Sequence, residues 1–547
     1  MTSSTITRTP IAPLAALLQL AMPCIAAEEA TIAQLSAAQA EERQSAVELT
    51  EWYLERIRTI DAGEGATHSV LAINPDAIEQ ALALDRERAI RGPRGPLHGI
   101  PILLKDNIET KDPLPTTAGS LALAANRTGR DAPIVARLRA AGAIVLGKTN
   151  LSEWANIRSP KSTSGWSAVG GLTRNPYALD RSACGSSSGS GVAVSANLAA
   201  AAIGTETDGS VTCPAAMNGL VGFKPTIGLL SRRHIVPISH TQDTAGPMTR
   251  TVADAAVLLT VMAGSDPEDL ATAEADARRV DYVAALDANS LAGTRLGVMW
   301  FETGYCSDAQ LAIFEQALQS LRDAGAELID LREEMPAEQL GTAELAVLLV
   351  ELKVNLDTYL ADAAPAVTTR TLADVIAFNE ANASSEMRWF GQEFFVQAQA
   401  TRGLEDPAYM EALQTARRLA GPEGIDRLLA LHGLDAMIAP TTGPAWLIDL
   451  ENGDEFGGSA TSLPAVAGYP HLTVPMGHVD GLPVGLSFIG PAWSDAMLLS
   501  LGHAFESKTR ARRVPGFSGL LGIQAPRVDE GQEVVDVDDA VAVDVGR

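Results

Sequence analysis

Apolar residues near the start of the chain recur with the spacing of a helix. Leu49, Tyr53, Ile57 and Ile60 follow one another at intervals of three or four residues, which places them on one helical face. The sequence Ser-Ala-Val-Glu at 45–48 has the pattern of a capping box, in which the first and fourth side chains bond each other's backbone N–H groups. The pattern therefore predicts an amphipathic helix that opens the fold.

Short apolar runs bounded by glycine or a charged residue follow along the chain. The runs at 101–104 and 143–146 have the composition of buried strands, and residues 133–141 between them have a helical pattern. Further strand-like runs, separated by helical patterns, occur at 199–203, 294–299, 436–439 and 471–474. This alternation predicts an α/β fold with packed layers of helix and sheet.

Two long segments differ from this alternation. Residues from about 308 to 432 are mainly helical in pattern, with a break at Gly421 and Pro422, and we expect them to form a helical insertion or flank. From Val528 onwards, acidic residues recur among small residues and no aromatic residue occurs. The segment 521–547 is therefore predicted to be a disordered, solvated acidic tail.

The composition narrows the range of partners. Of the 547 residues, 46% are hydrophobic, and the formal net charge is -26, so the chain can bury a large core and carries a strongly acidic surface. Nucleic-acid grooves and membrane-docking faces need clustered Lys and Arg. We therefore expect no nucleic-acid partner.

The amino terminus has the pattern of a secretory leader. Arg8 precedes an apolar stretch at 11–25 and two alanines, an order that is typical of a signal peptide. Residues 1–27 are therefore predicted to be a signal peptide, with the protein exported to the periplasm or beyond. Because two prolines interrupt the apolar stretch, a disordered leader on a cytoplasmic protein is the alternative. No later stretch approaches the roughly 20 apolar residues of a membrane span, so no membrane attachment is expected after processing.

The cysteines indicate neither a zinc site nor a disulfide scaffold, because they lack the paired spacing of either. No metal or other cofactor is expected. Cys184 and Cys213 flank two serine-containing motifs and can come close in space, and we expect them to be small buried thiols. The four cysteines are Cys24, Cys184, Cys213 and Cys306.

A block of small residues at 185–191, Gly-Ser-Ser-Ser-Gly-Ser-Gly, is the most unusual part of the composition. Such a block suits a tight backbone turn that leads into a small-residue helix at 192–198. A flexible glycine and serine linker is the alternative. The apolar and alanine-rich segments on both sides favour the turn.

The segment Gly-Thr-Glu-Thr-Asp-Gly-Ser at 204–210 places Ser210 between an apolar strand and a predicted helix. Gly209 permits a tight turn, so the backbone N–H groups of Thr207, Asp208, Gly209 and Ser210 can converge on one point. Converging N–H groups of this kind stabilise an oxyanion. The alternative is that Ser210 only caps the helix, which is the commonest role for a serine at such a position.

Lys105 directly follows the apolar run at 102–104. A lysine at the end of a buried strand is desolvated, which lowers its pKa and leaves part of the amine neutral and able to accept a proton. Two alternatives remain: the side chain can extend to solvent, or it can pair with Asp106.

These segments together resemble the amidase signature family, and the resemblance covers roughly residues 45 to 512. Each motif is weak by itself, but their order and spacing are specific. The matching segments are GIPILLKDN at 99–107, GSSSGSG at 185–191, GTETDGS at 204–210, GLVGFKPTIG at 219–228, DTAGPM at 243–248 and GLPVGLSFIG at 481–490.

The resemblance implies an architecture and a set of roles. The fold would be a large twisted mixed β-sheet with helices on both faces, in one domain at 28–520. Ser210 would be the acyl-forming nucleophile, Ser186 the bridging serine and Lys105 the final proton acceptor. The family's bridging serine follows a cis peptide bond, which predicts one between Gly185 and Ser186. The N–H groups of residues 207–210 would form the oxyanion hole.

The nucleophile segment resembles that of peptide amidases within this family, because Glu206, Thr207 and Asp208 precede a single glycine. Such enzymes convert the terminal amide of a peptide to a free acid and ammonia, so a small peptide amide is the expected substrate, and a monomer the expected state. We hypothesise that Asp208 and Trp166 shape the substrate pocket, with a surface loop and a core tryptophan as the alternative.

Other functions remain open. Another amide substrate is possible within the family, whether aliphatic, aryl or fatty, as is the ammonia-transferring component of a glutaminyl-tRNA amidotransferase. Residues 185–189 also fit the Gly-x-Ser-x-Gly elbow of an α/β-hydrolase esterase, with Ser187 as nucleophile, although the polar segment before them is unlike the strand that such an elbow needs. A binding protein with an inactive site is the non-enzymatic alternative.

Overall fold

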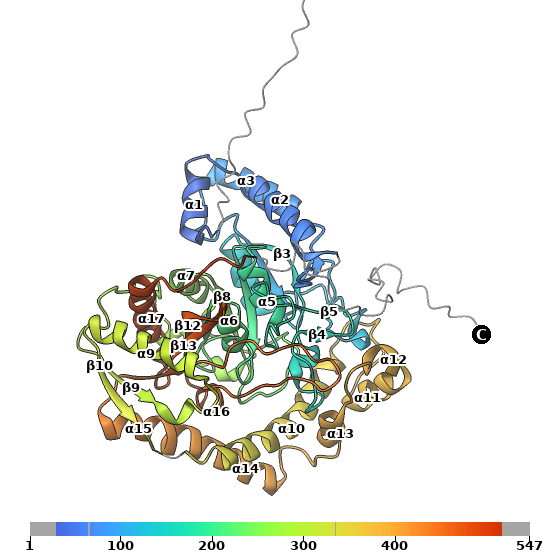
Figure 1. The fold of residues 1–547 in the computed structure, drawn as a ribbon. Helices are drawn as coiled ribbons and strands as arrows, with labels where there is room; N and C mark the ends of the chain where they lie inside the picture. Colours follow the sequence, from blue (N-terminus) through green and yellow to red (C-terminus); the bar gives the residue numbers. More distant parts are fainter. Residues whose placement is uncertain (1–28, 64–65, 334, 517–547) are drawn as a thin grey trace, which may run out of the picture.

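A mixed sheet of 11 strands runs through the centre of the computed structural model, which describes residues 29–63, 66–333 and 335–516 (Figure 1). The predicted signal peptide at 1–27 and acidic tail at 521–547 lie outside these residues. Helices cover both faces of the sheet. The prediction of an α/β fold built on a large mixed sheet is therefore confirmed.

The strand order of the sheet is β1-β3-β2-β6-β8-β7-β12-β13-β11-β9-β10. Strand β2 is parallel to both of its neighbours, β3 and β6, whereas β6 is antiparallel to β8. The strands are β1 (Val70–Ile73), β2 (Pro101–Lys105), β3 (Ile144–Thr149), β6 (Ala201–Glu206), β7 (Val221–Lys224), β8 (Thr244–Thr249), β9 (Arg295–Met299), β10 (Glu327–Leu331), β11 (Ala436–Pro440), β12 (His471–Val479) and β13 (Leu482–Ile489), with a separate hairpin of β4 (Trp166–Ser167) and β5 (Gly171–Leu172).

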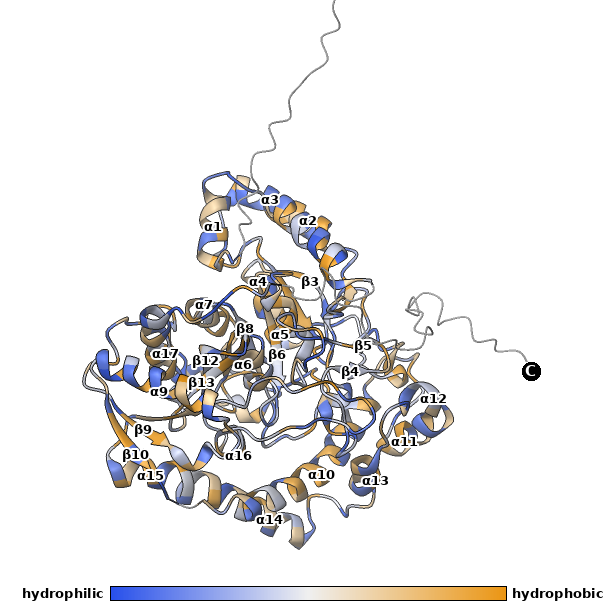
Figure 2. Ribbon diagram, viewed as in Figure 1, coloured by the Kyte–Doolittle hydropathy of each residue, from blue (hydrophilic) through white to orange (hydrophobic). Residues whose placement is uncertain are grey.

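The helices outside the flank lie around this sheet, and α6 and α17 pack on its opposite faces. The capping box predicted at Ser45 and Glu48 is present, and it begins α2. Figure 2 shows hydrophobic and hydrophilic positions alternating along α2 and α3, as expected for helices with one buried face. These helices are α1 (Ile32–Ala40), α2 (Ala46–Arg56), α3 (Ala77–Arg91), α4 (Pro133–Ala140), α5 (Ser188–Ser195), α6 (Thr212–Met217), α7 (Val252–Met262), α8 (Ala275–Arg278), α9 (Asp308–Asp323), α16 (Ser462–Ala467) and α17 (Asp495–Thr509).

Helices predominate in residues 308–432, where a helical flank is predicted, and Figure 1 shows α10, α14 and α15 as an arc along the lower edge of the molecule. At the predicted break, α14 ends at Ala420 and a π-helical turn at Gly421–Ile425 leads into α15. The flank consists of α10 (Ala337–Ala361), α11 (Leu372–Ala381), α12 (Ala383–Glu386), α13 (Glu393–Gln399), α14 (Pro407–Ala420) and α15 (Asp426–His432). Among the described residues of 308–432, β10 is the one strand, and loops join the helices.

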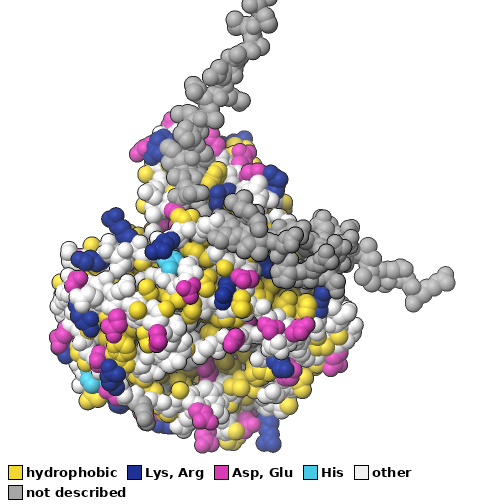
Figure 3. All heavy atoms as spheres, viewed as in Figure 1, with side chains coloured by type: hydrophobic (Ala, Val, Ile, Leu, Met, Phe, Trp, Pro, Cys, Tyr) yellow, Lys and Arg dark blue, Asp and Glu magenta, His cyan; other side chains and the backbone are white. Residues whose placement is uncertain are grey.

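Charged side chains of both signs are interspersed over the surface seen in Figure 3. None of the helices in the described residues is long and apolar enough to cross a membrane.

Candidate functional site

Lys105 is the last residue of β2 and is fully buried. Its Nζ lies 2.7 Å from Ser186 Oγ, 2.8 Å from Thr205 Oγ1 and 3.3 Å from the Thr205 carbonyl oxygen. Burial lowers the pKa of Lys105 to about 7, against the opposing effect of the negative charges of Asp243 and Glu206. A neutral amine has two N–H groups and one lone pair. Lys105 can therefore donate to both oxygens of Thr205 and accept a proton from Ser186.

Both structural alternatives for Lys105 are excluded. The side chain does not reach solvent, and the carboxylate of Asp106 pairs with a different lysine, Lys148, at 3.5 Å. Asp106 also accepts a hydrogen bond from the backbone N–H of Thr117 at 3.0 Å. Asp106 therefore does not pair with Lys105, whose side chain forms its hydrogen bonds with Ser186 and Thr205.

The peptide bond between Gly185 and Ser186 is cis, as predicted. Ser186 is fully buried, and its carbonyl accepts a hydrogen bond from Ser152 N at 3.1 Å. Helix α5 begins at Ser188, inside the glycine and serine block and four residues before its predicted start at 192. A Cβ at Gly189 would lie 2.3 Å from the Ser69 carbonyl oxygen. The block is thus a tightly packed turn and not a flexible linker.

Ser210 lies beside the Ser186 segment, because Ser187 N donates to the Ser210 carbonyl at 3.1 Å. The Ser210 residue is 7% exposed, and Gly209 before it has a φ of 76°. Within the part of the chain that the structure describes, no group accepts a hydrogen bond from the backbone N–H groups of residues 207–210. These four donors are free to bind a ligand.

Glu206 explains how the Ser210 segment is held, a role that no sequence motif predicted. One of its carboxylate oxygens accepts hydrogen bonds from Val211 N at 2.8 Å and Thr212 N at 2.9 Å. Val211 is the N-cap residue of α6 and makes no side-chain cap. The glutamate therefore does the capping that the alternative interpretation gave to Ser210. The one signal available in the sequence was the acidic residue Glu206, a few positions before the predicted helix start.

The expectation that Cys184 and Cys213 are buried thiols is wrong, because the two residues form a disulfide with a Cα–Cα distance of 6.1 Å. Cys184 lies two residues before Ser186, and Cys213 lies three residues after Ser210. The two cysteines are 29 positions apart in sequence, and only the packing of α5 beside α6 brings them together. The disulfide therefore joins the two serine segments covalently.

A group of carboxylic acids gathers around Asp208, two residues before Ser210. Asp208 Oδ2 accepts a hydrogen bond from Ser462 Oγ at 2.7 Å, and Glu344 Oε1 accepts one from Gln242 Nε2 at 2.8 Å. Burial raises the pKa of Asp208, and burial together with the charge of Asp208 raises the pKa of Glu344 well above its usual range. Burial and Asp208 also raise the pKa of Glu302 to about 7. Glu344 and Glu302 had no sequence motif that could reveal them.

Trp166, the other predicted pocket residue, is 3% exposed. Its ring packs edge-on against Phe390, with ring centroids 5.2 Å apart, and the Arg158 guanidinium lies 5.8 Å from the ring centre. These are the contacts of a core side chain, and the role of Trp166 in the substrate pocket stays a prediction.

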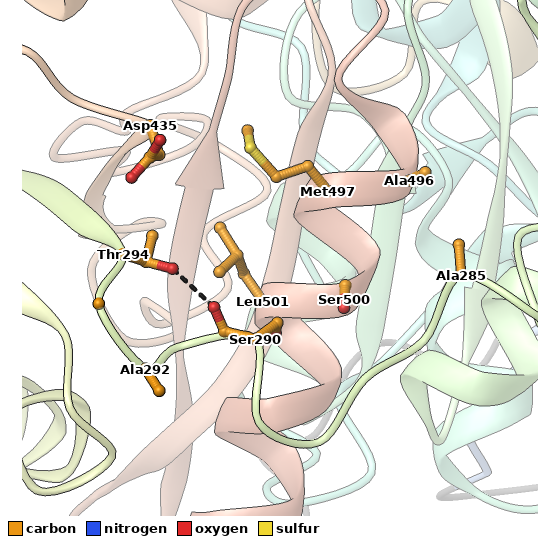
Figure 4. Close-up of a pocket in the computed structure, with 10 residues that line it drawn as sticks. Ala285, Ser290, Ala292, Thr294, Asp435, Ala496, Met497, Ser500 and Leu501 are labelled. Atoms are coloured by element: carbon orange, nitrogen blue, oxygen red, sulfur yellow. Dashed lines mark hydrogen bonds between the residues drawn. The ribbon is translucent and has the colours of Figure 1, made fainter.

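Two further observations bear on ligands. In the described residues, no group of three or more His, Cys, Asp or Glu side chains could hold a metal ion. Figure 4 shows a surface hollow between the loop that ends at Thr294 and helix α17, lined by Ala285, Met497 and Leu501 among others. Neither Lys105 nor the segments at 185–191 and 204–210 line it.

The chain also matches known proteins along most of its length. A family model described as Amidase matches residues 48–499. A probable amidase of Arabidopsis thaliana is 40% identical, covering 90% of this chain and 92% of the relative. One component of the glutamyl-tRNA(Gln) amidotransferase of Pseudomonas aeruginosa is 36% identical, covering 89% of this chain and 99% of that relative.

Among solved structures, the native peptide amidase of Stenotrophomonas maltophilia superimposes with a TM-score of 0.86 at 53% identity. The match covers 90% of this chain and 99% of that one. The same enzyme in complex with the competitive inhibitor chymostatin matches with the same TM-score and identity. The lysine and serine motifs, the fold and these relatives agree, and the chain belongs to the amidase signature family of hydrolases.

Proposed function

We propose that this amidase hydrolyses the carboxyl-terminal amide of peptides to the free acid and ammonia, with Ser210 as nucleophile. The observation that carries the proposal is the fully buried Lys105, whose pKa is lowered to about 7 and whose Nζ lies 2.7 Å from Ser186 Oγ. A base with a pKa near the working pH combines sufficient basicity with a useful fraction in the free-base form.

In the first half of the reaction, neutral Lys105 takes the proton of Ser186, and Ser186 takes the proton of Ser210. The Ser210 oxygen then forms a bond to the amide carbon, and the carbonyl electron pair moves to the carbonyl oxygen. The N–H groups of Thr207, Asp208, Gly209 and Ser210 hold the resulting oxyanion.

The second half returns the proton. Protonated Lys105 donates through Ser186 to the amide nitrogen, the carbon–nitrogen bond breaks, and ammonia leaves. This return is necessary because an unprotonated amide nitrogen is a poor leaving group. Water then repeats the sequence on the acyl-enzyme, and Ser210 is released with the peptide acid.

The similarity to peptide amidase supports the choice of substrate. The solved peptide amidase from Stenotrophomonas maltophilia is 53% identical over nearly its whole length. We further propose that Asp208, two residues before the nucleophile, and Trp166 shape the substrate pocket. Loss of the Trp166 ring in Trp166→Ala should then change the ranking of different peptide amides as substrates.

Export is a separate proposal. The predicted signal peptide at 1–27 would carry the protein to the periplasm or beyond. The Cys184–Cys213 disulfide supports this location, because disulfides persist in oxidising compartments and are rare in the cytosol. Sequencing the amino terminus of the protein recovered from periplasmic and culture fractions would test it. An uncleaved chain confined to the cytosol would contradict it.

The function is tested by incubating the purified protein with a panel of peptide amides, fatty amides, aryl amides and glutamine, and following ammonia and acid products by mass spectrometry. Peptide amides should turn over fastest, with no cleavage of internal peptide bonds. Faster turnover of another class would overturn the proposed substrate.

The nucleophile is tested in parallel with a fluorophosphonate probe and peptide mapping. The adduct should lie on Ser210 and be absent from Ser210→Ala. An adduct on Ser187 would instead support the esterase alternative, and the absence of any adduct would support a binding protein.

A further inference from the structure

The loop at 207–209, just before Ser210, is held by side chains from separate parts of the chain. Ser462 Oγ, in the first turn of α16, donates to Asp208 Oδ2 at 2.7 Å. Gln242 Nε2, between β7 and β8, donates to the Thr207 carbonyl at 3.4 Å. The positions of the backbone N–H groups in this loop therefore depend on side-chain contacts.

Glu344, on the flank helix α10, contacts the same loop at two successive residues. Its Oε1 accepts a hydrogen bond at 2.8 Å from Gln242 Nε2, the group that also binds the Thr207 carbonyl. Its carboxyl group hydrogen-bonds directly with that of Asp208. Glu344 is only 7% exposed. One buried acid of the flank thus supports the loop through Gln242 and through Asp208.

The contact between Glu344 and Asp208 needs a proton. A carboxylate is only an acceptor, so two carboxyl groups can bond each other only when one of them is protonated. Among the described residues, no Lys, Arg or His forms an ion pair with either group. Asp208 Oδ1 is buried and receives no hydrogen bond from an N–H group or a hydroxyl of the described residues. Two buried carboxylates in contact cannot both ionise readily, so the pair keeps one proton.

The surroundings of the two acids differ, and they place this proton on Glu344. Burial raises the pKa of Asp208, but the hydroxyls of Thr461 and Ser462 and the positive charge of Lys224 lower it. Glu344 has no nearby cation. Burial and the charge of Asp208 raise its pKa well above the usual range. Asp208 is therefore the anion of the pair, and Glu344 is the neutral acid.

Two further acids face Asp208 from other elements, Glu206 at the end of β6 and Glu302 after β9. Burial raises the pKa of Glu206, with Lys224 opposing and Asp208 adding to this rise. Burial and the charge of Asp208 raise the pKa of Glu302 to about 7. These acids add negative charge around Asp208, which disfavours a second anion in contact with it.

We infer that Glu344 is a positioning residue for the hydrolysis: as a neutral acid it donates a hydrogen bond to the Asp208 carboxylate and so fixes the loop N–H groups where the oxyanion forms. The inference rests on the proposed role of Ser210 as nucleophile. Glu344 acts through Asp208 and Gln242 and not on the substrate. Such support matters because oxyanion donors are effective only when they are already in place before the reaction.

This role gives the reaction an alkaline limit. As the pH rises through the pKa of Glu344, the pair loses its shared proton, the two carboxylates repel each other, and the loop is no longer held. Lys105 cannot cause such a loss, because rising pH only increases its neutral form, which starts the proposed relay. Since the oxyanion exists only in the transition state, kcat and kcat/KM should fall together at high pH.

Two substitutions of Glu344 test the role by their pH profiles. Glu344→Gln keeps an N–H donor for Asp208 and an acceptor for Gln242 but does not titrate. Glu344→Leu removes both interactions and should lower kcat and kcat/KM equally, by about tenfold to a hundredfold. Glu344→Gln should recover most of that loss at neutral pH, and its alkaline limb should disappear or move upward by about one pH unit or more.

Glu351→Gln is the matched control, because Glu351 is also a fully buried acid on α10. Its carboxylate accepts hydrogen bonds from Ser239 Oγ at 2.5 Å and from the Tyr409 hydroxyl at 2.7 Å, and it forms none with residues 207–210. The substitution should lower thermal stability and leave the alkaline limb where it is in the wild type. An equal shift in Glu351→Gln would assign the effect to general packing and overturn the role of Glu344.

The shared proton is also measured without reference to activity, by infrared spectroscopy of protein that contains isotope-labelled glutamate. At neutral pH, the difference spectrum between the wild type and Glu344→Gln should contain the carbonyl band of one carboxylic acid. That band should disappear from the wild type over the same pH range as the alkaline loss of activity. A difference spectrum with only a carboxylate band would show that Glu344 is ionised, and the inference would be wrong.

The remaining outcomes separate this inference from the proposed function. If Ser210 reacts with the fluorophosphonate probe and peptide amides are hydrolysed, but Glu344→Gln keeps the wild-type alkaline limb, the inference fails and the function stands. If Ser210 labels normally but another class of amide is the better substrate, the proposed substrate fails and the pH profiles are measured on that class. If Ser210→Ala remains active, the nucleophile is wrong and the inference fails with it.

Discussion

At the scale of single residues, the proposed relay can start only when Lys105 is unprotonated. Its pKa is lowered to about 7 by burial, so the amine is neutral above that pH and charged below it. Only the neutral amine can accept a proton. The rate of Ser210 acylation should therefore fall as the pH drops through about 7, and kcat/KM for a peptide amide should follow the same curve. An acid limb centred well below pH 6 or above pH 8 would contradict this role for Lys105.

Asp243 gives a second test of the same lysine. Its negative charge raises the pKa of Lys105, and its own pKa is raised to about 6 by burial, so it is ionised across most of the relevant range. Asp243→Asn removes the charge, lowers the pKa of Lys105 further and should move the acid limb of the pH profile to lower pH. Thermal unfolding would first show that Asp243→Asn is folded. If the acid limb of its pH profile then matched that of the wild type, a group other than Lys105 would control the acid limb.

Glu206 should contribute to stability through the start of α6. Glu206→Ala leaves the N–H groups of Val211 and Thr212 buried without an acceptor, and it should lower the free energy of unfolding by about 1–3 kcal/mol. Glu206→Gln keeps one oxygen and should cost less. Urea denaturation of the three proteins measures this order. Equal stability of Glu206→Ala and wild type would show that the cap is dispensable.

The chemistry of single residues could be predicted from sequence only where a motif surrounded them. Lys105 followed a buried apolar run, so its desolvation was foreseeable. Ser210 and Ser186 each had a structural alternative, and only the joint resemblance to a family separated them from other serines. Glu344 has no motif of its own, because it faces Asp208 only after α10 packs against a loop more than one hundred residues away.

Between elements, β2 and β3 are joined by a buried ion pair as well as by backbone hydrogen bonds. Asp106 and Lys148 are both fully buried, and Lys148 also donates to the Ile108 carbonyl at 2.6 Å. Lys148→Met leaves the carboxylate unpaired and should cost about 3–5 kcal/mol of unfolding free energy. The double variant Asp106→Asn with Lys148→Met should recover most of that loss.

The pH dependence of Lys148→Met gives this prediction a distinct signature. Without the lysine charge, burial raises the pKa of Asp106 still further, so the folded state binds a proton that the unfolded state releases. The destabilisation should therefore shrink as the pH is lowered. Arg58→Met, which breaks an exposed pair with Glu55, is the control and should change stability little at any pH.

The strands and helices matched the sequence pattern best where the segment is fully buried. The apolar runs at 101–104, 436–439 and 471–474 all became strands of the sheet. Helix starts were less predictable. Ser188 and Gly189 have low helix propensity, yet they begin α5 because the close contacts around Gly189 fix the backbone there.

For the whole molecule, the sequence pattern indicated the layers but not their arrangement. Nothing in the periodicity shows that β2 lies between β3 and β6, or that the flank helix α10 brings Glu344 to Asp208. These positions depend on packing between segments that are far apart in the chain. The resemblance to a family supplied the overall architecture that local patterns could not.

The Cys184–Cys213 disulfide closes a loop that contains both serines and thereby stabilises the whole site. A cross-link over 29 positions restricts the unfolded chain and should contribute about 3–4 kcal/mol to stability. A variant with serine at both positions should unfold at lower temperature and show a lower kcat with a similar KM. Cys306→Ser, which removes the free cysteine of the described residues, is the control for a thiol change elsewhere and should resemble the wild type.

The same bond can form only after the chain has been synthesised and folded. In a newly synthesised chain Cys184 and Cys213 are both thiols, and an oxidant must remove their hydrogens before the bond can join the two serine segments. We predict that full activity depends on this oxidation. Protein made in a reducing host should emerge underactive, gain activity on treatment with oxidised glutathione, and lose two titratable thiols as it does so.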